Sequence, residues 1–138
     1  MSYTTIWIHA VWSTKYRRPY LKNDIRENVF KHIKEYANEK GIQIDCVNGY
    51  EDHIHCLIFL KRKQNIADVV KAIKGESTFW INKNCEMNEK FRWQNDYYAI
   101  SVGQRELKYV RKYIRDQVKH HEHKSVDDEI KILIPTPV

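Results

Sequence analysis

Long apolar runs, paired cysteines and flexible linkers are missing from this sequence, and each absence excludes a class of protein. No stretch approaches the roughly 20 apolar residues that a membrane-spanning helix needs. The opening residues, MSYTTIWIHAVW, lack the charged region and long apolar core of a secretory signal. The only cysteines are Cys46, Cys56 and Cys85, without Cys-x-x-Cys spacing, which favours reduced thiols over a disulfide framework. We therefore expect a cytoplasmic protein.

The sequence also has no internal repeat, low-complexity tract or Gly/Ser-rich linker. Its 138 residues, 42% of them hydrophobic and 30% charged, suit one globular domain with a buried core. We predict a single domain over residues 1–138, with a tail from about residue 125 that holds a short amphipathic piece at 126–133.

Positive charge predominates, with 24 Lys and Arg against 18 Asp and Glu, a net charge of +6 and a pI of about 9.2. Such a surface favours a polyanionic partner, nucleic acid among them. Because charge supplies affinity rather than identity, it narrows the class of partner without choosing one.

Apolar periodicity predicts elements in the order β-α-β-β-α-β-α. Strands are expected at residues 4–14, 42–47, 53–60 and 96–102. Helices are expected from Asn23 or Asp24 to just before Gly41, from Asn65 to about Trp80, and from Gln104 to about His121. Asn23 or Asp24 is a plausible N-cap of the first helix, and Asn48-Gly49 is a hairpin turn signal.

The first six elements match the split βαβ plan of a ferredoxin-like α+β fold. We expect one antiparallel four-stranded sheet with two helices on one face, and with the first and third strands at its centre. The extra C-terminal helix could cover part of the other face.

A His-Ile-His sequence lies at the start of the third predicted strand. Residues two apart on a strand point to the same face, so His53 and His55 project together, along with Leu57 and Phe59. Ile54 and the alternate positions after it point into the core. Two parallel imidazoles on a central strand form a rigid pair of metal ligands or phosphate donors.

A second such pair, His121-Glu122-His123, lies in or beside the last predicted helix. Helical positions two apart diverge by about 200°, and the middle residue is charged. We interpret this pair as a solvated helix end.

Tyr113 and Gln117 lie four residues apart in the last predicted helix, so their side chains share one face. They flank an apolar stripe of Val110, Ile114 and Val118 that fixes how the helix docks. The alternative is a half-buried packing tyrosine beside a surface glutamine.

Several stretches in order carry a resemblance to a known family. They are Glu51-Asp52-His53-Ile54-His55, Trp12-Ser13-Thr14-Lys15-Tyr16-Arg17-Arg18-Pro19, Lys71-Ala72-Ile73-Lys74-Gly75-Glu76-Ser77, and Val110-Arg111-Lys112-Tyr113-Ile114-Arg115-Asp116-Gln117 with His120-His121 after it. The first resembles the His-hydrophobe-His motif of HUH endonucleases. The whole chain, from about residue 5 to 130, resembles the single-tyrosine transposases of the insertion sequence 200/605 type, which are encoded by mobile elements.

The resemblance implies that His53, His55 and Gln117 hold one divalent ion and that Tyr113 attacks a DNA phosphate. It implies Mg²⁺ or Mn²⁺ as the ion, with zinc chemically possible. The product would be a 5′-phosphotyrosine, which a new 3′-hydroxyl can reverse. Family members are homodimers whose active site is often shared between subunits, and they recognise DNA hairpins and the adjacent single strands.

Candidate DNA contacts follow two strands. They are Lys15, Arg17 and Arg18 after the first strand, and Lys61, Arg62 and Lys63 after the third, where they are expected to rim the site. Possible stacking residues are Tyr16, Trp93, Tyr97 and Tyr98, although aromatics on strands are more often core.

Two other functions are compatible with these residues. One is an HUH replication-initiator or relaxase-like nickase; the small size and the tyrosine C-terminal to the histidines argue against the larger relaxases. The other is a non-catalytic ferredoxin-like nucleic-acid-binding module, which normally reads bases from aromatics on its exposed sheet face. On the third strand only Phe59 would supply one.

Overall fold

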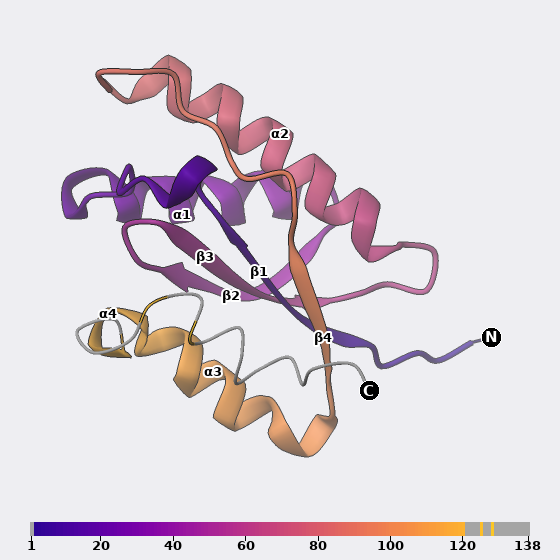
Figure 1. Ribbon diagram of the computed structural model, residues 1–138. Coiled ribbons are helices and arrows are strands. Elements are labelled where there is room, and N and C mark those ends of the chain that lie inside the picture. The colour runs from indigo at the N-terminus through magenta and orange to yellow at the C-terminus, as the bar shows by residue number, and fades with distance from the viewer. Residues whose placement is uncertain (1, 121–124, 126–127, 129–138) are drawn as a thin grey trace.

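The computed structural model describes residues 2–120, 125 and 128 (Figure 1). Its centre is a four-stranded antiparallel sheet with the strand order β2-β3-β1-β4. The strands are β1 (Trp7–Ser13), β2 (Gln43–Gly49), β3 (His53–Phe59) and β4 (Tyr98–Val102). The first and third strands are central, as the split βαβ plan requires, and the predicted ferredoxin-like fold is confirmed.

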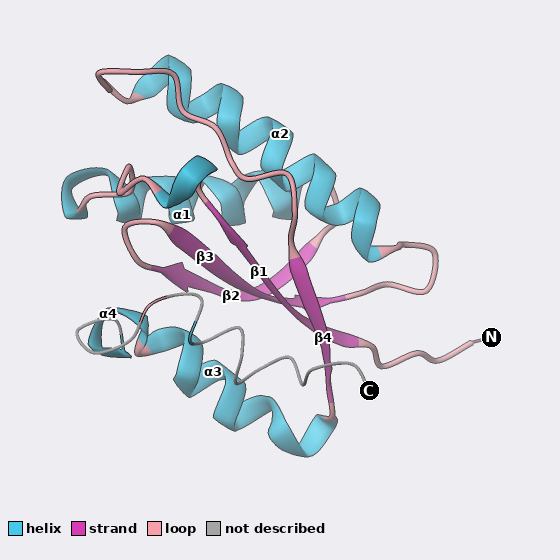
Figure 2. Ribbon diagram, viewed as in Figure 1, coloured by secondary structure: helices cyan, strands magenta, loops and turns pink. Residues whose placement is uncertain are grey.

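Two long helices, α1 (Asn23–Glu39) and α2 (Ile66–Asn84), cover one face of this sheet (Figure 2). Their apolar residues and the inward side chains of β1 and β3, such as Trp12, Ile54 and Ile58, form the main core. The start of the second helix predicted at Asn65 is confirmed, and Asn65 is its N-cap, since its Oδ1 accepts a hydrogen bond of 2.9 Å from the Asp68 N–H. The N-cap predicted at Asn23 or Asp24 is wrong: both residues lie within α1, and Lys22 occupies the N-cap position without a side-chain cap.

The C-terminal helix lies on the opposite face of the sheet, over β2 and β3 (Figure 1). The prediction of one continuous helix is wrong: the 3₁₀ turn η2 (Gln104–Glu106) leads into α3 (Leu107–Arg115), and α4 (Gln117–His120) follows a break at Asp116. The Asn48 amide donates hydrogen bonds of 3.0 Å to the carbonyls of both Ile114 and Arg115. A side chain that inserts at a helix end in this way is a recognised cause of a break.

The hairpin between β2 and β3 turns later than Asn48-Gly49. Both residues are still in β2, where they pair with His55 and Ile54, and the turn is made by residues 50–52. A Cβ on Gly49 would lie 2.2 Å from the carbonyl oxygen of His53. This glycine therefore permits a close backbone approach at the histidine strand rather than forming the turn.

Within the described residues no helix is long and apolar enough to cross a membrane. The sequence His121-Glu122-His123 and most of the predicted 126–133 piece lie outside those residues.

Candidate functional site

The histidine pair of β3 lies under the C-terminal helix. His53 and His55 are fully buried, and their rings lie 5.0 Å apart at 75°. Leu57, on the same face, packs with Leu107 and Ile114 of α3. The predicted division of β3 into a histidine face and a core face is confirmed, since alternate side chains of a strand point in opposite directions.

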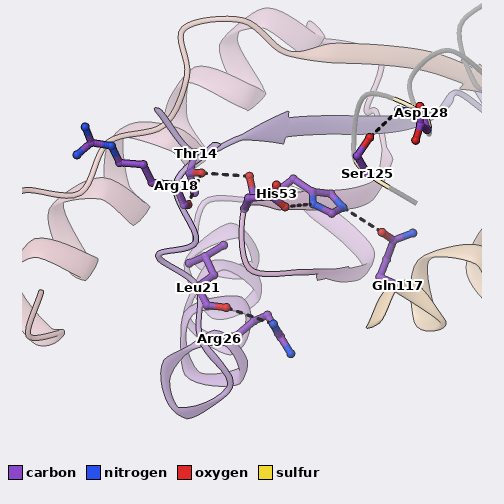
Figure 3. Close-up of polar contacts among 9 residues, drawn as sticks. Thr14, Arg18, Leu21, Arg26, His53, Gln117, Ser125 and Asp128 are labelled. Carbon is purple, nitrogen blue, oxygen red and sulfur yellow. Dashed lines mark hydrogen bonds and ion pairs between the residues drawn. The ribbon is translucent and has the colours of Figure 1, made fainter. Parts of the chain in front are cut away.

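His53 is held from both sides (Figure 3). Its Nδ1 lies 2.8 Å from the Asp52 carboxylate, and its Nε2 lies 3.1 Å from Gln117 Oε1. An ionised carboxylate only accepts hydrogen bonds, so Nδ1 of the ring donates and the lone pair of a neutral ring is on Nε2. Asp52 therefore fixes the ring so that its basic nitrogen faces the glutamine.

Gln117 is fully buried at the start of α4. Its Nε2 donates a hydrogen bond of 3.2 Å to the backbone carbonyl of Tyr113. That bond determines which way the amide is turned, and it directs the oxygen to His53. His53 Nε2 and Gln117 Oε1 therefore face each other at 3.1 Å.

His55 contacts a third histidine that the sequence analysis did not identify. His9 of β1 is almost fully buried, and its Nε2 lies 2.8 Å from His55 Nδ1. This hydrogen bond orients the His55 ring as Asp52 orients His53. Alternation along β1 places His9 and Val11 on the same face of the sheet. Only the register with β3 shows which face this is: Val11 pairs with His55, so His9 lies diagonally beside His55.

Tyr113 lies in α3 beside the histidines of its own chain. Its half-buried ring is 5.7 Å from the His55 ring and 6.2 Å from the His9 ring, between centroids. The structure thus brings the four residues of the expected site, His53, His55, Tyr113 and Gln117, together within one chain.

Two side chains of β2 hold α3 in this place. Asn48 binds the last carbonyls of the helix, as described above. Asp45, at a β-bulge between Ile44 and Cys46, accepts hydrogen bonds from Arg111 at 2.7 and 3.3 Å. A bulge re-aims a side chain away from the regular pleat, here towards the helix.

His53, His55 and Gln117 supply two imidazole nitrogens and an amide oxygen that could hold a divalent ion. Imidazole nitrogens and amide oxygens are both ligands of divalent ions in proteins, and His53 Nε2 and Gln117 Oε1 lie 3.1 Å apart, so both could contact one ion. Among the described residues no group of three or more His, Cys, Asp or Glu could hold a metal, so a metal bound by the two histidines would need a further ligand such as the Gln117 amide oxygen.

The cysteines do not contribute a reactive thiolate. Burial raises the pKa of the Cys46 thiol to about 11 and raises the pKa of Cys56 further, because a charged thiolate is poorly solvated there. Burial also raises the pKa of Cys85. All of them are free thiols, in agreement with the sequence prediction.

The two basic clusters lie at opposite ends of the sheet. Ser13, just before Lys15, Arg17 and Arg18, pairs with His53, so this cluster is next to the site. Residues 61–63 follow the far end of β3, which spans about 20 Å. The expectation that Lys61, Arg62 and Lys63 rim the site is wrong, because leaving the same strand does not mean leaving it at the same end.

The candidate stacking aromatics divide by exposure. Trp93 is buried in the core, where its indole N–H donates to Ser77 Oγ at 2.8 Å, so its prediction as a stacking residue is wrong. Tyr97 packs partly against the same core. Tyr16 and Tyr98 are 74% and 38% exposed, and both remain accessible to a base.

Two curated transposases align with most of the chain. The ISDra2 transposase TnpA of Deinococcus radiodurans is 26% identical over 114 residues, which cover 79% of this chain and 81% of the relative. The transposase for insertion sequence element IS200 of Salmonella typhimurium is 26% identical over 133 residues, which cover 92% of this chain and 84% of the relative.

Two solved structures share the fold. A structure from Deinococcus radiodurans assigned as a transposase has a TM-score of 0.69 at 21% identity, over 84% of this chain and 93% of that one. A REP-associated tyrosine transposase bound to a REP hairpin has a TM-score of 0.62 at 19% identity, over 95% of this chain and 82% of that one.

The family model described as "Transposase IS200 like" matches residues 2–117. That span takes in the whole sheet, both histidines of β3, Tyr113 and Gln117. With a match over most of its length, the chain belongs to the IS200-like transposase family.

Proposed function

We propose that this transposase cleaves and rejoins single-stranded DNA, with Tyr113 as the nucleophile and a divalent ion held by His53, His55 and Gln117. The observation that carries the proposal is the linkage within the site. Gln117 binds both the His53 ring and the Tyr113 backbone, so the tyrosine and the donor set are held by one hydrogen-bonded chain.

The chemistry follows from the groups in place. The Tyr113 hydroxyl oxygen forms a bond to phosphorus, and the bond from phosphorus to the 3′ oxygen breaks. The proton lost by the phenol balances the one gained by the 3′-hydroxyl. The product is a 5′-phosphotyrosine, and a second 3′-hydroxyl reverses the step without an external energy source. A bound Mg²⁺ or Mn²⁺ offsets charge on the phosphoryl oxygens.

The protein's own contribution is position. A phenol with a pKa near 10 is a modest nucleophile at neutral pH, so its placement and the exclusion of water matter. Leu107 and Ile114 seal α3 against Leu57 of the sheet, and Asn48 fixes the end of the helix. Asp52 and His9 hold the imidazole rings, which leaves little freedom in the donor set.

DNA with hairpin ends is the proposed substrate. The related REP-associated transposase was solved with a hairpin bound, and the basic loop of Lys15, Arg17 and Arg18 lies beside the site. Phosphate contacts by this loop position the strand. Lys61, Arg62 and Lys63 remain predicted DNA contacts, now on a surface about 20 Å from the histidines.

We also propose a homodimer, because transposition must hold two DNA ends. The resemblance implies a site shared between subunits, whereas in the structure His53, His55, Tyr113 and Gln117 of one chain also lie close together. Mixing Tyr113→Phe chains with His53→Ala chains separates the two arrangements. A shared site recovers cleavage in the mixed dimer, and a site built within one chain does not.

A non-catalytic binding module fits the structure less well. Such a module reads bases on an open sheet face, but here α3 covers that face over β2 and β3.

The test is a covalent adduct between the full-length protein and a hairpin-bearing single strand in Mg²⁺ or Mn²⁺. Tyr113→Phe should abolish the adduct while DNA binding remains. Tyr109→Phe is the matched control, since Tyr109 lies in the same helix and is 65% exposed. An adduct that survives in Tyr113→Phe assigns the nucleophile elsewhere, and tight binding without any adduct supports the binding module.

A further inference from the structure

We propose that a small cavity beside the histidine pair binds one unpaired base of the DNA strand and prefers guanine. The inference rests on the proposed function and adds a specificity site to it. The cavity has a volume of about 320 Å³ and is lined by Ser13, Tyr16, Arg17, Gln94, Asp96 and Tyr98. Ligand pockets range from roughly 300 to 1,000 Å³, so this one suits a single base rather than a duplex.

The strand register places the cavity next to the site. Ser13 of β1 pairs with His53, and Val11 of β1 pairs with both His55 and Tyr98. Tyr98 of β4 therefore lies across β1 from the histidines, at a distance of two strand spacings, about 10 Å. A nucleotide adjacent to a phosphate held at the histidines can reach this cavity.

A strained loop presents two of the lining residues. Tyr16 and Arg17 have φ of 57° and 55°, a left-handed conformation that side-chain-bearing residues rarely adopt. The loop is fixed in it by several bonds: Arg17 N–H to the Thr14 carbonyl at 3.0 Å, Lys15 N–H to the Arg92 carbonyl at 2.9 Å, and Thr14 N–H to the Asp52 carbonyl at 2.9 Å. Strain that the surroundings maintain in this way is concentrated at functional sites.

The lining residues match a base better than a phosphate. Tyr16 and Tyr98 offer two exposed aromatic rings, and rings of this kind stack with bases. Lys15 and Arg18 lie over the Tyr16 ring, 5.3 and 5.5 Å from its centroid, so the cations that neutralise the backbone adjoin the stacking surface. Asp96 in the cavity would repel a bare phosphate, but it accepts hydrogen bonds from a base edge.

The polar groups select among the bases. A carboxylate binds best where two N–H donors lie side by side, as N1–H and N2–H of guanine do. The Gln94 Oε1 accepts from the Tyr16 N–H at 3.4 Å, which leaves Nε2 as the donor of that amide. A donor in the same cavity as the carboxylate matches guanine O6. Thymine places a carbonyl on each side of its one N–H and is the poorest match.

The experiment compares short oligothymidine strands that carry one guanine, adenine, cytosine or abasic nucleotide, with the full-length protein, by fluorescence anisotropy. The guanine strand should bind at least about fivefold more tightly than all-thymine, the ratio for about 1 kcal/mol. The abasic strand should bind no better than thymine. Asp96→Asn should remove the guanine preference. Tyr98→Ala should weaken binding of every strand, because each strand can place a base on this ring.

Glu27→Gln is the matched control, because it removes the same charge from an exposed position of α1 on the opposite face. It should keep the preference. A wild-type protein without guanine preference overturns the inference, as does a preference that persists in Asp96→Asn. Asp96→Asn that tightens binding of all strands equally indicates a phosphate site and also overturns it.

The adduct assay separates this inference from the proposed function. Adduct formation without base preference leaves the function in place and removes the base site. Guanine preference without an adduct supports the base site and contradicts the catalytic proposal.

Discussion

Substitution of Asn48 in β2 should disturb the site, although this side chain is not a proposed contact of DNA or metal. Its Nδ2 donates two hydrogen bonds of 3.0 Å, to the carbonyls of Ile114 and Arg115, at the point where α3 ends. Asn48→Ala removes both. The bond to Ile114 is partly buried and the bond to Arg115 is exposed, so they differ in strength.

The expected loss can be worked from these two contacts. A hydrogen bond contributes about 0.5–1.5 kcal/mol net, with exposed ones at the low end. The variant should therefore lose about 1–2 kcal/mol of unfolding free energy, or about 3–8 °C of Tm for a domain of this size. Because Tyr113 and Gln117 flank the break, adduct formation should fall by about tenfold, the factor for about 1.4 kcal/mol of lost positioning.

Urea unfolding and the rate of adduct formation measure the two effects separately. Asn28→Ala is the control, since Asn28 is an exposed residue of α1 on the other side of the sheet, and it should change neither. If Asn48→Ala loses stability but forms adduct at the wild-type rate, the side chain does not position the catalytic helix and the reasoning is refuted.

Three further predictions concern single side chains. Gly49→Ala places a Cβ 2.2 Å from the His53 carbonyl oxygen and should lower the unfolding free energy in urea by about 1–3 kcal/mol. Gly75→Ala, in open space on α2, should raise it by about 0.5–1 kcal/mol. Equal effects of the two variants would contradict the close approach at Gly49. His9→Ala should weaken Mn²⁺ binding by about 10- to 100-fold in calorimetry, because the His55 ring loses its orienting partner. His9→Gln should restore part of the affinity. An unchanged Mn²⁺ affinity in His9→Ala would contradict this role of His9. The pKa of Cys46 is raised by burial from 9.0 to about 11, so the unfolded thiol ionises first and stability should fall from pH 9 to 11. Cys46→Ala should lessen that fall, and an identical pH profile would contradict it.

Alternation and helical spacing were enough to predict the sheet order and the two faces of β3. The side chains of a strand alternate whatever surrounds it, so His53 and Leu57 could be placed on one face and Ile54 on the other from the sequence. The start of the second helix at Asn65 is equally local and was also predicted correctly.

The errors arise where a distant residue decides the local structure. The helix break at Asp116 depends on Asn48, which lies far earlier in the chain. Gly49 serves a close contact with His53 rather than the turn that Asn-Gly usually forms. His9 could not be assigned to the site until the register joined β1 to β3.

Asp52 contacts both the basic loop, where DNA would bind, and His53, which would hold the ion. Its carbonyl accepts a hydrogen bond of 2.9 Å from the Thr14 backbone N–H, at the base of the basic loop, while its carboxylate holds His53. Ordering of the loop by DNA and ordering of the ring by an ion would therefore act on the same residue. By thermodynamic linkage, a strand that tightens ion binding by some factor must itself be bound more tightly by that factor when the ion is present. DNA affinity measured in a chelator would then understate the affinity of the loaded protein.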